Sequence, residues 1–127
     1  MSAATVTRTE RGYAGHFIGC AKCSFRRNTL LELGEVRVVV STVGSYRAGK
    51  DGEVIPVSAA WNRYYETMAF RAAPAGGPYV EATGDGIKVA ATCAINECEF
   101  DSDFAADLMH EAVVAEIAAR MEAGETF

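Results

Sequence analysis

The sequence lacks several features that would place it in a large functional class. No apolar run reaches the ~18 residues that a membrane-spanning helix needs. The segment from Met1 to Arg8 has neither the basic start nor the apolar stretch of a secretory signal. The complete phosphate-binding signature Gly-x-x-x-x-Gly-Lys-Ser/Thr is missing, and so are dinucleotide fingerprints and His-x-Glu deaminase elements. We therefore expect a cytoplasmic protein without a membrane partner.

Histidine is scarce, which limits the catalytic chemistry that the chain could support. Only His16 and His110 are present, and neither stands in a nucleophile-elbow or Cys-His signature. His110 falls between apolar residues of a predicted helix, where a hydrogen-bonded core or interface histidine is the usual finding. The sequence thus favours a binding protein over an enzyme, and we expect it to need no cofactor.

Four cysteines remain to be explained in a chain expected to be cytoplasmic, where disulfides are rare. Cys20 and Cys23 have zinc-knuckle spacing, and Cys93 with Cys98 could complete a four-thiolate site. The second pair, however, has four intervening residues, and the sequence around both pairs is typical of strands. We favour buried thiols, which pack as small apolar groups, and expect no metal.

Charge is distributed unevenly along this 127-residue chain, whose length suits a single domain. Ten basic and six acidic residues precede Ala72, whereas two basic and eleven acidic residues lie from Ala72 onward. Such polarity suggests a basic site for an anion or an acid–base contact between subunits. The net charge of −5 disfavours a nucleic-acid polymer as partner.

Hydrophobic periodicity predicts an α+β fold, with a mainly antiparallel sheet of four to six strands and a long C-terminal helix packed on it. Gly34-Glu35 suits a two-residue type II′ hairpin, and the valine-rich strand after it is apolar on both faces and hence central. The predicted elements are a flexible arm over 1–11, strands over 12–18, 25–33, 36–43, 63–71 and 87–95, and a loop over 44–58.

The segment 102–123 predicts the helix, with Asp101, Ser102 and Asp103 at its start and Gly124 at its end. Its apolar surface comprises two adjoining stripes: Phe104, Leu108, Ala112, Ala115 and Ala119 form one, and Met109, Val113, Ile117 and Met121 form the other. This width exceeds what one sheet face requires. We therefore expect a neighbouring subunit to cover part of it, in a homodimer or a higher homo-oligomer.

Two clusters of residues favour ligand binding, one over Arg26–Thr29 and the other over Arg63–Thr67. In the strand over 63–71 the odd positions, including Tyr65, are predicted to form an open cationic face, while Tyr64, Met68 and Phe70 pack inward. Arginine forks match phosphates, tyrosine stacks on bases, and asparagine or threonine can read polar edges. The candidate ligand-binding residues are His16, Arg26, Arg27, Asn28, Arg63, Tyr65, Thr67 and Asn96. The structural alternative is that Arg27 and Arg63 pair with Glu32 and Glu66 across strands.

Several phrases of the sequence resemble a family of small bacteriophage proteins, the first Thoeris anti-defence type. These phrases are spread over most of the length of the chain: Glu10–Phe17, Phe25–Leu31, Val39–Gly44, Arg63–Phe70 and Met109–Ile117. The segment from Ile87 to Cys98 departs from the pattern, because Lys88-Val89-Ala90 stands where an aromatic followed by polar residues is expected.

The resemblance implies a protein that sequesters a cyclic ADP-ribose type of immune signal, or cyclic oligonucleotides, without cleaving it. It also implies an oligomer with the ligand between subunits, aromatic stacking on adenine and arginines on phosphates, in the cytoplasm of the host cell. The alternative is a phage or bacterial inhibitor that binds a host protein directly through the acidic C-terminal helix, and a small enzyme is a third interpretation.

Overall fold

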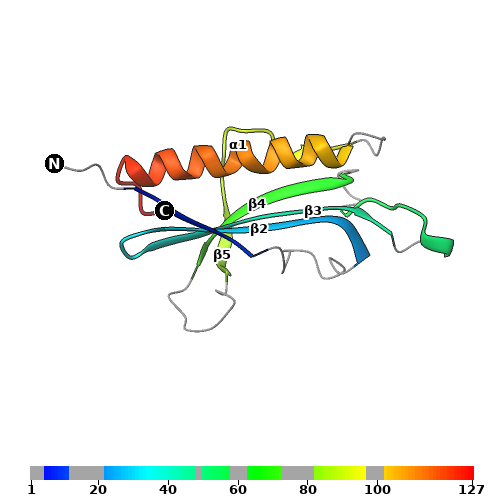
Figure 1. The fold of residues 1–127 in the computed structure, drawn as a ribbon, viewed down its shortest axis with the longest axis horizontal. Helices are drawn as coiled ribbons and strands as arrows, with labels where there is room; N and C mark the ends of the chain where they lie inside the picture. Colours follow the sequence, from blue (N-terminus) through cyan, green and yellow to red (C-terminus); the bar gives the residue numbers. More distant parts are fainter. Residues whose placement is uncertain (1–4, 12–21, 48–49, 58–62, 73–81, 97–101) are drawn as a thin grey trace.

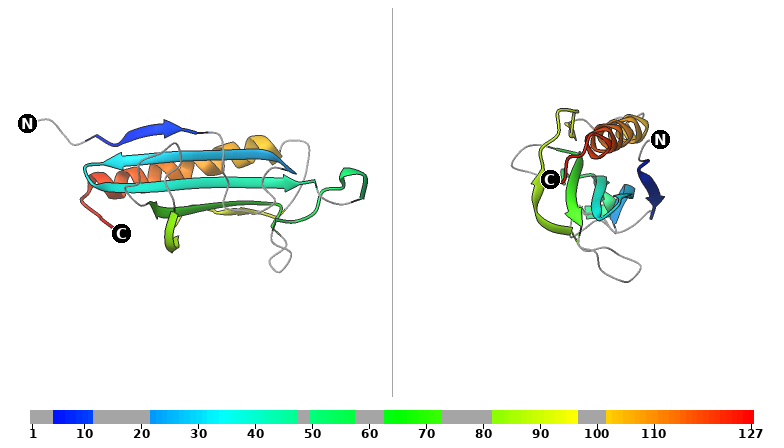
Figure 2. Two further views of the ribbon diagram at one scale, coloured as in Figure 1. Left: turned by 90° about the horizontal axis from the view of Figure 1, so that it is seen from below. Right: turned by 90° about the vertical axis from the view of Figure 1, so that its left-hand side faces the viewer.

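The structure is a computed structural model that describes residues 5–11, 22–47, 50–57, 63–72, 82–96 and 102–127. It contains a six-stranded antiparallel sheet with one long helix packed on one face (Figures 1 and 2). The elements are β1 Thr7–Glu10, β2 Cys23–Leu33, β3 Val36–Tyr46, the short 3-10 helix η2 Lys50–Gly52, β4 Tyr65–Ala72, β5 Ala82–Ile87, β6 Ala94–Ile95 and α1 Ser102–Glu122. The predicted α+β fold is confirmed.

The sheet order β1-β2-β3-β4-β5 follows the order of the chain, and β6 pairs with β4 beyond the end of β5. β3 lies at the centre, as its valines predict: Val38 and Val40 contribute to the core under α1, while Val39 and Val43 belong to other buried clusters. Leu33 pairs with Val36, so the hairpin loop is Gly34-Glu35. Gly34 has φ 60°, the positive angle that a type II′ turn requires at its first position.

α1 runs along the long strands and covers one face of the sheet (Figure 1). Its stripe of Met109, Val113, Ile117 and Met121 is buried, together with Val114, as apolar periodicity predicts. The helix ends in a Schellman motif, because the amide of Gly124 donates to the Met121 carbonyl and that of Glu125 to the Arg120 carbonyl, each at 3.0 Å. Gly124 has φ 95°, as the predicted stop requires.

The other predicted stripe of the helix stays exposed. Phe104 is 67% exposed and Leu108 is 56% exposed, and Ala112, Ala115 and Ala119 continue the exposed row along the helix. The sheet therefore covers one of the two stripes that the sequence predicts.

Two predicted boundaries are wrong for physical reasons. Residues 7–10 are not part of a flexible arm, because they form β1 and pair with β2 from Thr7↔Glu32 to Glu10↔Thr29. The segment 87–95 is not one strand, since the backbone amides of Ala90 and Ala91 leave the sheet and donate to the Glu116 carboxylate of α1 at 2.9 Å. The departure of this segment from the sheet separates β5 from β6. The predicted strand over 12–18 lies outside the described residues.

The predicted orientation of β4 is also wrong. Tyr65, Thr67 and Ala69 form the face under α1 and are 2%, 2% and 1% exposed, whereas Met68 and Phe70 are only half-buried. The polar atoms of Tyr65 and Thr67 can lie on this buried face because they form hydrogen bonds with Asp103 and Thr42. β3 is also longer than predicted: it continues to Tyr46, and Gly44, predicted to open a loop, lies against the Tyr65 ring.

Candidate ligand-binding site

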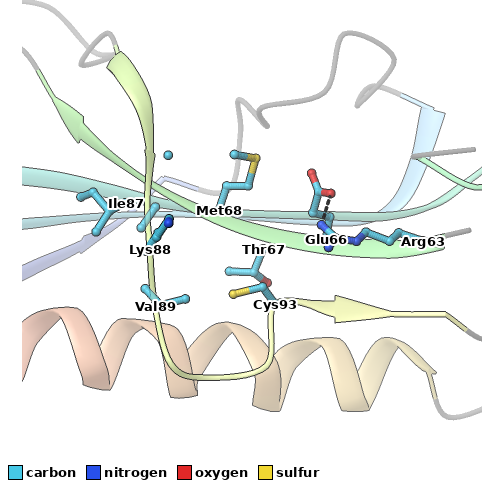
Figure 3. Close-up of a pocket in the computed structure, with 10 residues that line it drawn as sticks. Arg63, Glu66, Thr67, Met68, Ile87, Lys88, Val89 and Cys93 are labelled. Atoms are coloured by element: carbon cyan, nitrogen blue, oxygen red, sulfur yellow. Dashed lines mark hydrogen bonds and ion pairs between the residues drawn. The ribbon is translucent and has the colours of Figure 1, made fainter. Parts of the chain in front are cut away.

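A pocket of about 400 Å³ opens where the chain leaves the sheet between β5 and β6. Its residues come from β4 and the turn before it, from the end of β5, and from the segment that descends from β5 towards α1 and returns to β6 (Figure 3). The lining comprises Arg63, Glu66, Thr67, Met68, Ala69, Gly86, Ile87, Lys88, Val89 and Cys93. The departure of residues 88–93 from the sheet thus creates the hollow beside β4.

The pocket combines cationic and apolar walls. Arg63 contributes a guanidinium whose NH1 lies 2.9 Å from the Glu66 carboxylate, and Lys88 stands on the opposite wall, which is otherwise apolar (Figure 3). Burial, and then the charge of Glu116, raises the pKa of the Cys93 thiol. The Cys93 thiol donates to the Ala91 carbonyl at 3.3 Å, so it is a neutral group held by the backbone.

A chain of buried side-chain hydrogen bonds begins at Thr67 and crosses the core. Thr67 Oγ1 lies 2.7 Å from Thr42 Oγ1, and Thr42 Oγ1 lies 2.6 Å from His110 Nδ1. On the other side of the ring, His110 Nε2 lies 2.7 Å from Thr29 Oγ1, which reaches the Glu10 carboxylate at 2.9 Å. His110 is 0% exposed, which agrees with the predicted core histidine. Burial, reinforced by the charge of the nearby Arg27, lowers its pKa to about 4.

The far end of this chain is an ion cluster formed by Arg8, Glu10, Arg27, Asp107 and Glu111. Arg27 bonds to all three carboxylates at 2.8–2.9 Å, and Arg8 bonds to Glu10 and Glu111. Hydrogen bonds from Arg8, ahead of those from Arg27, lower the pKa of Glu111 to about 2. Burial alone would raise the pKa of Glu10, but its bonds to Arg8, Thr29 and Arg27 lower it instead. The cluster joins β1 and β2 to α1.

Glu10, His110 and Glu111 are the described residues whose donor atoms come closest to a metal-ligand set, all lying within 4.8 Å of one another. Each is already engaged: His110 Nε2 bonds to Thr29, and Arg8 bonds to both carboxylates. A metal ion would have to displace these partners, and we therefore assign the two carboxylates to the ion cluster and His110 to the hydrogen-bond chain. Of the four cysteines, Cys23 is buried and Cys93 half-buried, while Cys20 and Cys98 lie outside the described residues.

The structure brings two of the predicted site residues, Arg63 and Thr67, together in the pocket. Arg63 also forms an ion pair with Glu66, the partner that the structural alternative predicts, but within one segment and not across strands. Arg27 does not pair with Glu32 and lies instead in the ion cluster, where carboxylates surround its guanidinium.

The remaining predicted residues are separated from the pocket lining. The Tyr65 ring is buried and its hydroxyl donates to Asp103 at 2.5 Å, so the predicted open aromatic face is not formed. Asn28 is buried, with its side-chain oxygen accepting from Arg11 at 2.7 Å. Arg26 and Asn96 are exposed, and His16 lies outside the described residues.

Sequence reasoning did not identify Lys88 or Cys93 as pocket residues. Both fall in a segment that reads as a continuous strand, and the break depends on Glu116, more than twenty residues away in the sequence.

Comparisons with protein-family models, with curated proteins and with solved structures find no match to this chain. Among the described residues, α1 is the one long helix, and it is not apolar enough to cross a membrane.

Proposed function

We propose that the protein binds a phosphate-bearing small molecule in the pocket beside β4 and sequesters it without chemical change. The ligand class is a cyclic nucleotide signal of the cyclic ADP-ribose type or a cyclic oligonucleotide, as the resemblance of the sequence implies. One observation carries the proposal: Arg63 and Lys88 face a hollow of about 400 Å³ that also has apolar walls. This volume lies within the range of small-ligand sites, roughly 300–1,000 Å³.

The chemistry of the lining supports binding over catalysis. The Cys93 thiol has a raised pKa and is therefore a poor nucleophile at neutral pH. Glu66 is held by Arg63 and is not positioned as an independent base. Guanidinium and ammonium groups bind phosphate oxygens through charge-assisted hydrogen bonds, while the apolar wall of Met68, Ile87 and Val89 can contact a base or ribose.

Replacing Arg63 with alanine is expected to weaken nucleotide binding about tenfold to a hundredfold. A hydrogen bond between charged groups contributes about 1.5–3 kcal/mol, and this variant removes the guanidinium of the pocket. Titration calorimetry with cyclic ADP-ribose measures the change. Arg71→Ala is the matched control, because Arg71 is an exposed arginine of β4 that does not line the pocket. Equal affinities of the two variants and the wild type would contradict the site.

A release experiment tests sequestration itself. The protein is loaded with the nucleotide, separated from free ligand and heat-denatured, and the released material is examined by mass spectrometry. Intact nucleotide is expected, since no step of the proposal changes the ligand. Released products would identify an enzyme, and the absence of any nucleotide would contradict the proposed function.

We further propose that a second copy of the chain covers the exposed face of α1. In an antiparallel helix pair with its two-fold axis near Ala112, Phe104 would meet Ala119 of the partner subunit and Leu108 would meet Ala115 of the partner subunit. Large side chains in the first half of the helix thus face small ones in the second half. This match in size is what a symmetric interface requires of a single surface.

The charges beside the exposed face also favour a second copy. On one flank, Asp107 and Glu111 are held by arginines of their own protomer. On the other flank, Glu116 accepts from two backbone amides and from Arg120. Acidic groups that are already paired repel a second acidic helix weakly, and they offer little to a basic partner.

Leu108→Lys is expected to convert the dimer into a monomer, because the interface would bury an unpaired charge. Sedimentation velocity at micromolar concentration measures the change, and Glu35→Gln in the exposed hairpin loop is the control of equal charge change. A dimeric Leu108→Lys protein would contradict the interface. A monomeric wild type would contradict the homodimer and favour the second candidate function, direct binding of a host protein by this helix face.

A further inference from the structure

The buried hydrogen-bond chain between the pocket and the ion cluster has a direction that the chemistry of its members fixes. Glu10 is an ionised carboxylate held by two arginines, so it can only accept, and Thr29 donates to it. Thr29 has one proton and must therefore accept from His110 Nε2. Since a neutral imidazole has one donor, Nδ1 accepts from Thr42, and Thr42 in turn accepts from Thr67.

This order determines what Thr67 can offer to the pocket. Its one hydroxyl proton is directed at Thr42, away from the pocket, and its remaining lone pair can accept a hydrogen bond. The Cys93 thiol does not take up this lone pair, because it donates to the Ala91 carbonyl. Thr67 is only 2% exposed but contributes to the pocket lining, and Figure 3 shows it beside Cys93. A ligand group therefore reaches it only by entering the pocket.

The cationic residues of the pocket and Thr67 therefore require opposite hydrogen-bonding groups on a ligand. Arg63 and Lys88 supply donors with positive charge, which suit phosphate oxygens. Thr67 supplies an acceptor, which suits a hydroxyl or an amine and leaves a phosphate oxygen without a donor. If the Thr67 hydroxyl donated into the pocket, the Thr42 hydroxyl would have to donate to Thr67. His110 Nδ1 would then need a proton of its own in order to donate to Thr42, and burial disfavours the doubly protonated, charged ring.

We propose that Thr67 is a specificity-determining residue, through which the pocket selects phosphate esters that also carry a hydroxyl or amine donor. Nucleoside phosphates and sugar phosphates belong to this class, whereas inorganic phosphate chains present mainly acceptors. A polar group placed to bond a ligand donor discriminates against ligands that lack it, because the polar group is then left unpaired. The inference rests on the proposed function and specifies which phosphate compounds the site accepts.

Two probes and two variants test the selection. Adenosine 5′-monophosphate carries phosphate and donors, and inorganic pyrophosphate carries phosphate alone. In calorimetry Thr67→Val is expected to weaken nucleotide binding about five- to tenfold and to leave pyrophosphate binding unchanged, while Thr67→Ser retains the wild-type preference. Lys88→Ala is expected to weaken both probes. If Thr67→Val weakened both probes alike, or neither, the specificity role would be overturned while the phosphate site stood.

The direction of the chain is tested without any ligand. Nitrogen NMR of histidine-labelled protein at pH 7 is expected to show His110 with its proton on Nε2, and His16→Gln identifies the signal. A proton on Nδ1 would overturn the inference whatever the probes do. If the wild type binds cyclic ADP-ribose but neither probe at millimolar concentration, the specificity role is overturned while the proposed function stands. If it binds none of the three, the proposed function fails as well, even where the tautomer is as expected.

Discussion

Replacing Gly44 with alanine is expected to lower the free energy of unfolding by about 3 kcal/mol, the upper end of the cost of overpacking a core. A Cβ at this position would lie 2.0 Å from Cδ2 and 2.4 Å from Cγ of Tyr65, which pairs with Gly44 across β3 and β4. The ring cannot withdraw, because its hydroxyl is bonded to Asp103 and Phe25 packs edge-on with ring centroids 6.3 Å apart. The strand itself would have to move.

Gly86→Ala is the matched control for this substitution. Its added Cβ would meet the terminal methyl of Met68 at 2.8 Å, and a flexible side-chain end can rotate away. Its cost is expected to stay below about 1 kcal/mol. Urea unfolding followed by circular dichroism measures both variants. Equal stabilities of the two variants would show that the close approach of the Tyr65 ring does not constrain the fold.

Acidification from pH 7 to pH 4 is expected to remove up to about 3 kcal/mol of stability through His110 alone. Its pKa is about 4 in the folded protein and 6.5 in its ordinary state, so the unfolded chain binds the proton first. The contribution is present above pH 6.5 and is lost as the pH falls towards 4. The charged groups facing the ring are Arg27, Glu10, Glu111 and Arg8, and the lowered pKa values of the two carboxylates add a further loss below about pH 4.5.

Urea unfolding at half-unit pH intervals measures this dependence. His110→Gln is expected to be less stable at pH 7, because both threonine hydroxyls lose the imidazole, but to change little in stability between pH 6.5 and 4.5. His16→Gln is expected to keep the wild-type slope and so separates the two histidines. A wild-type stability that stays flat over this interval, or an unchanged slope in His110→Gln, would contradict the buried neutral histidine.

Local patterns were enough to predict the parts of the fold that local interactions determine. The hairpin at Gly34, the central position of β3 and the helix with its Gly124 stop all depend on residues close in sequence. β1 was missed because Thr7-Arg8-Thr9-Glu10 has no apolar alternation and becomes a strand by pairing with β2. The break between β5 and β6 was missed because it depends on Glu116 of the distant helix.

The candidate site was predictable by residue type but not by side-chain direction. Arg63, just before β4, and Thr67, on β4, were correctly predicted by residue type as site residues and line the pocket. The buried face was assigned wrongly because Tyr65 and Thr67 carry polar atoms that the sequence alone leaves unpartnered. In the structure Asp103 and Thr42 bond to those atoms, and both partners come from other elements. Arg27 of β2 likewise pairs with carboxylates of α1, and no local sequence pattern identifies these partners.

Strands β1 to β5 are adjacent in the sheet in the order in which they are synthesised, and α1 follows them. This order has a consequence for biosynthesis. Each strand from β2 to β4 can pair with its predecessor as the chain emerges, but the face formed by Val38, Val40 and Thr42 stays uncovered until α1 is made. An interrupted chain that ends before residue 102 would carry an apolar sheet face with no intramolecular cover. Such a product would be recognised by chaperones or would aggregate. Synthesis of α1 is therefore the step that buries this face within the chain.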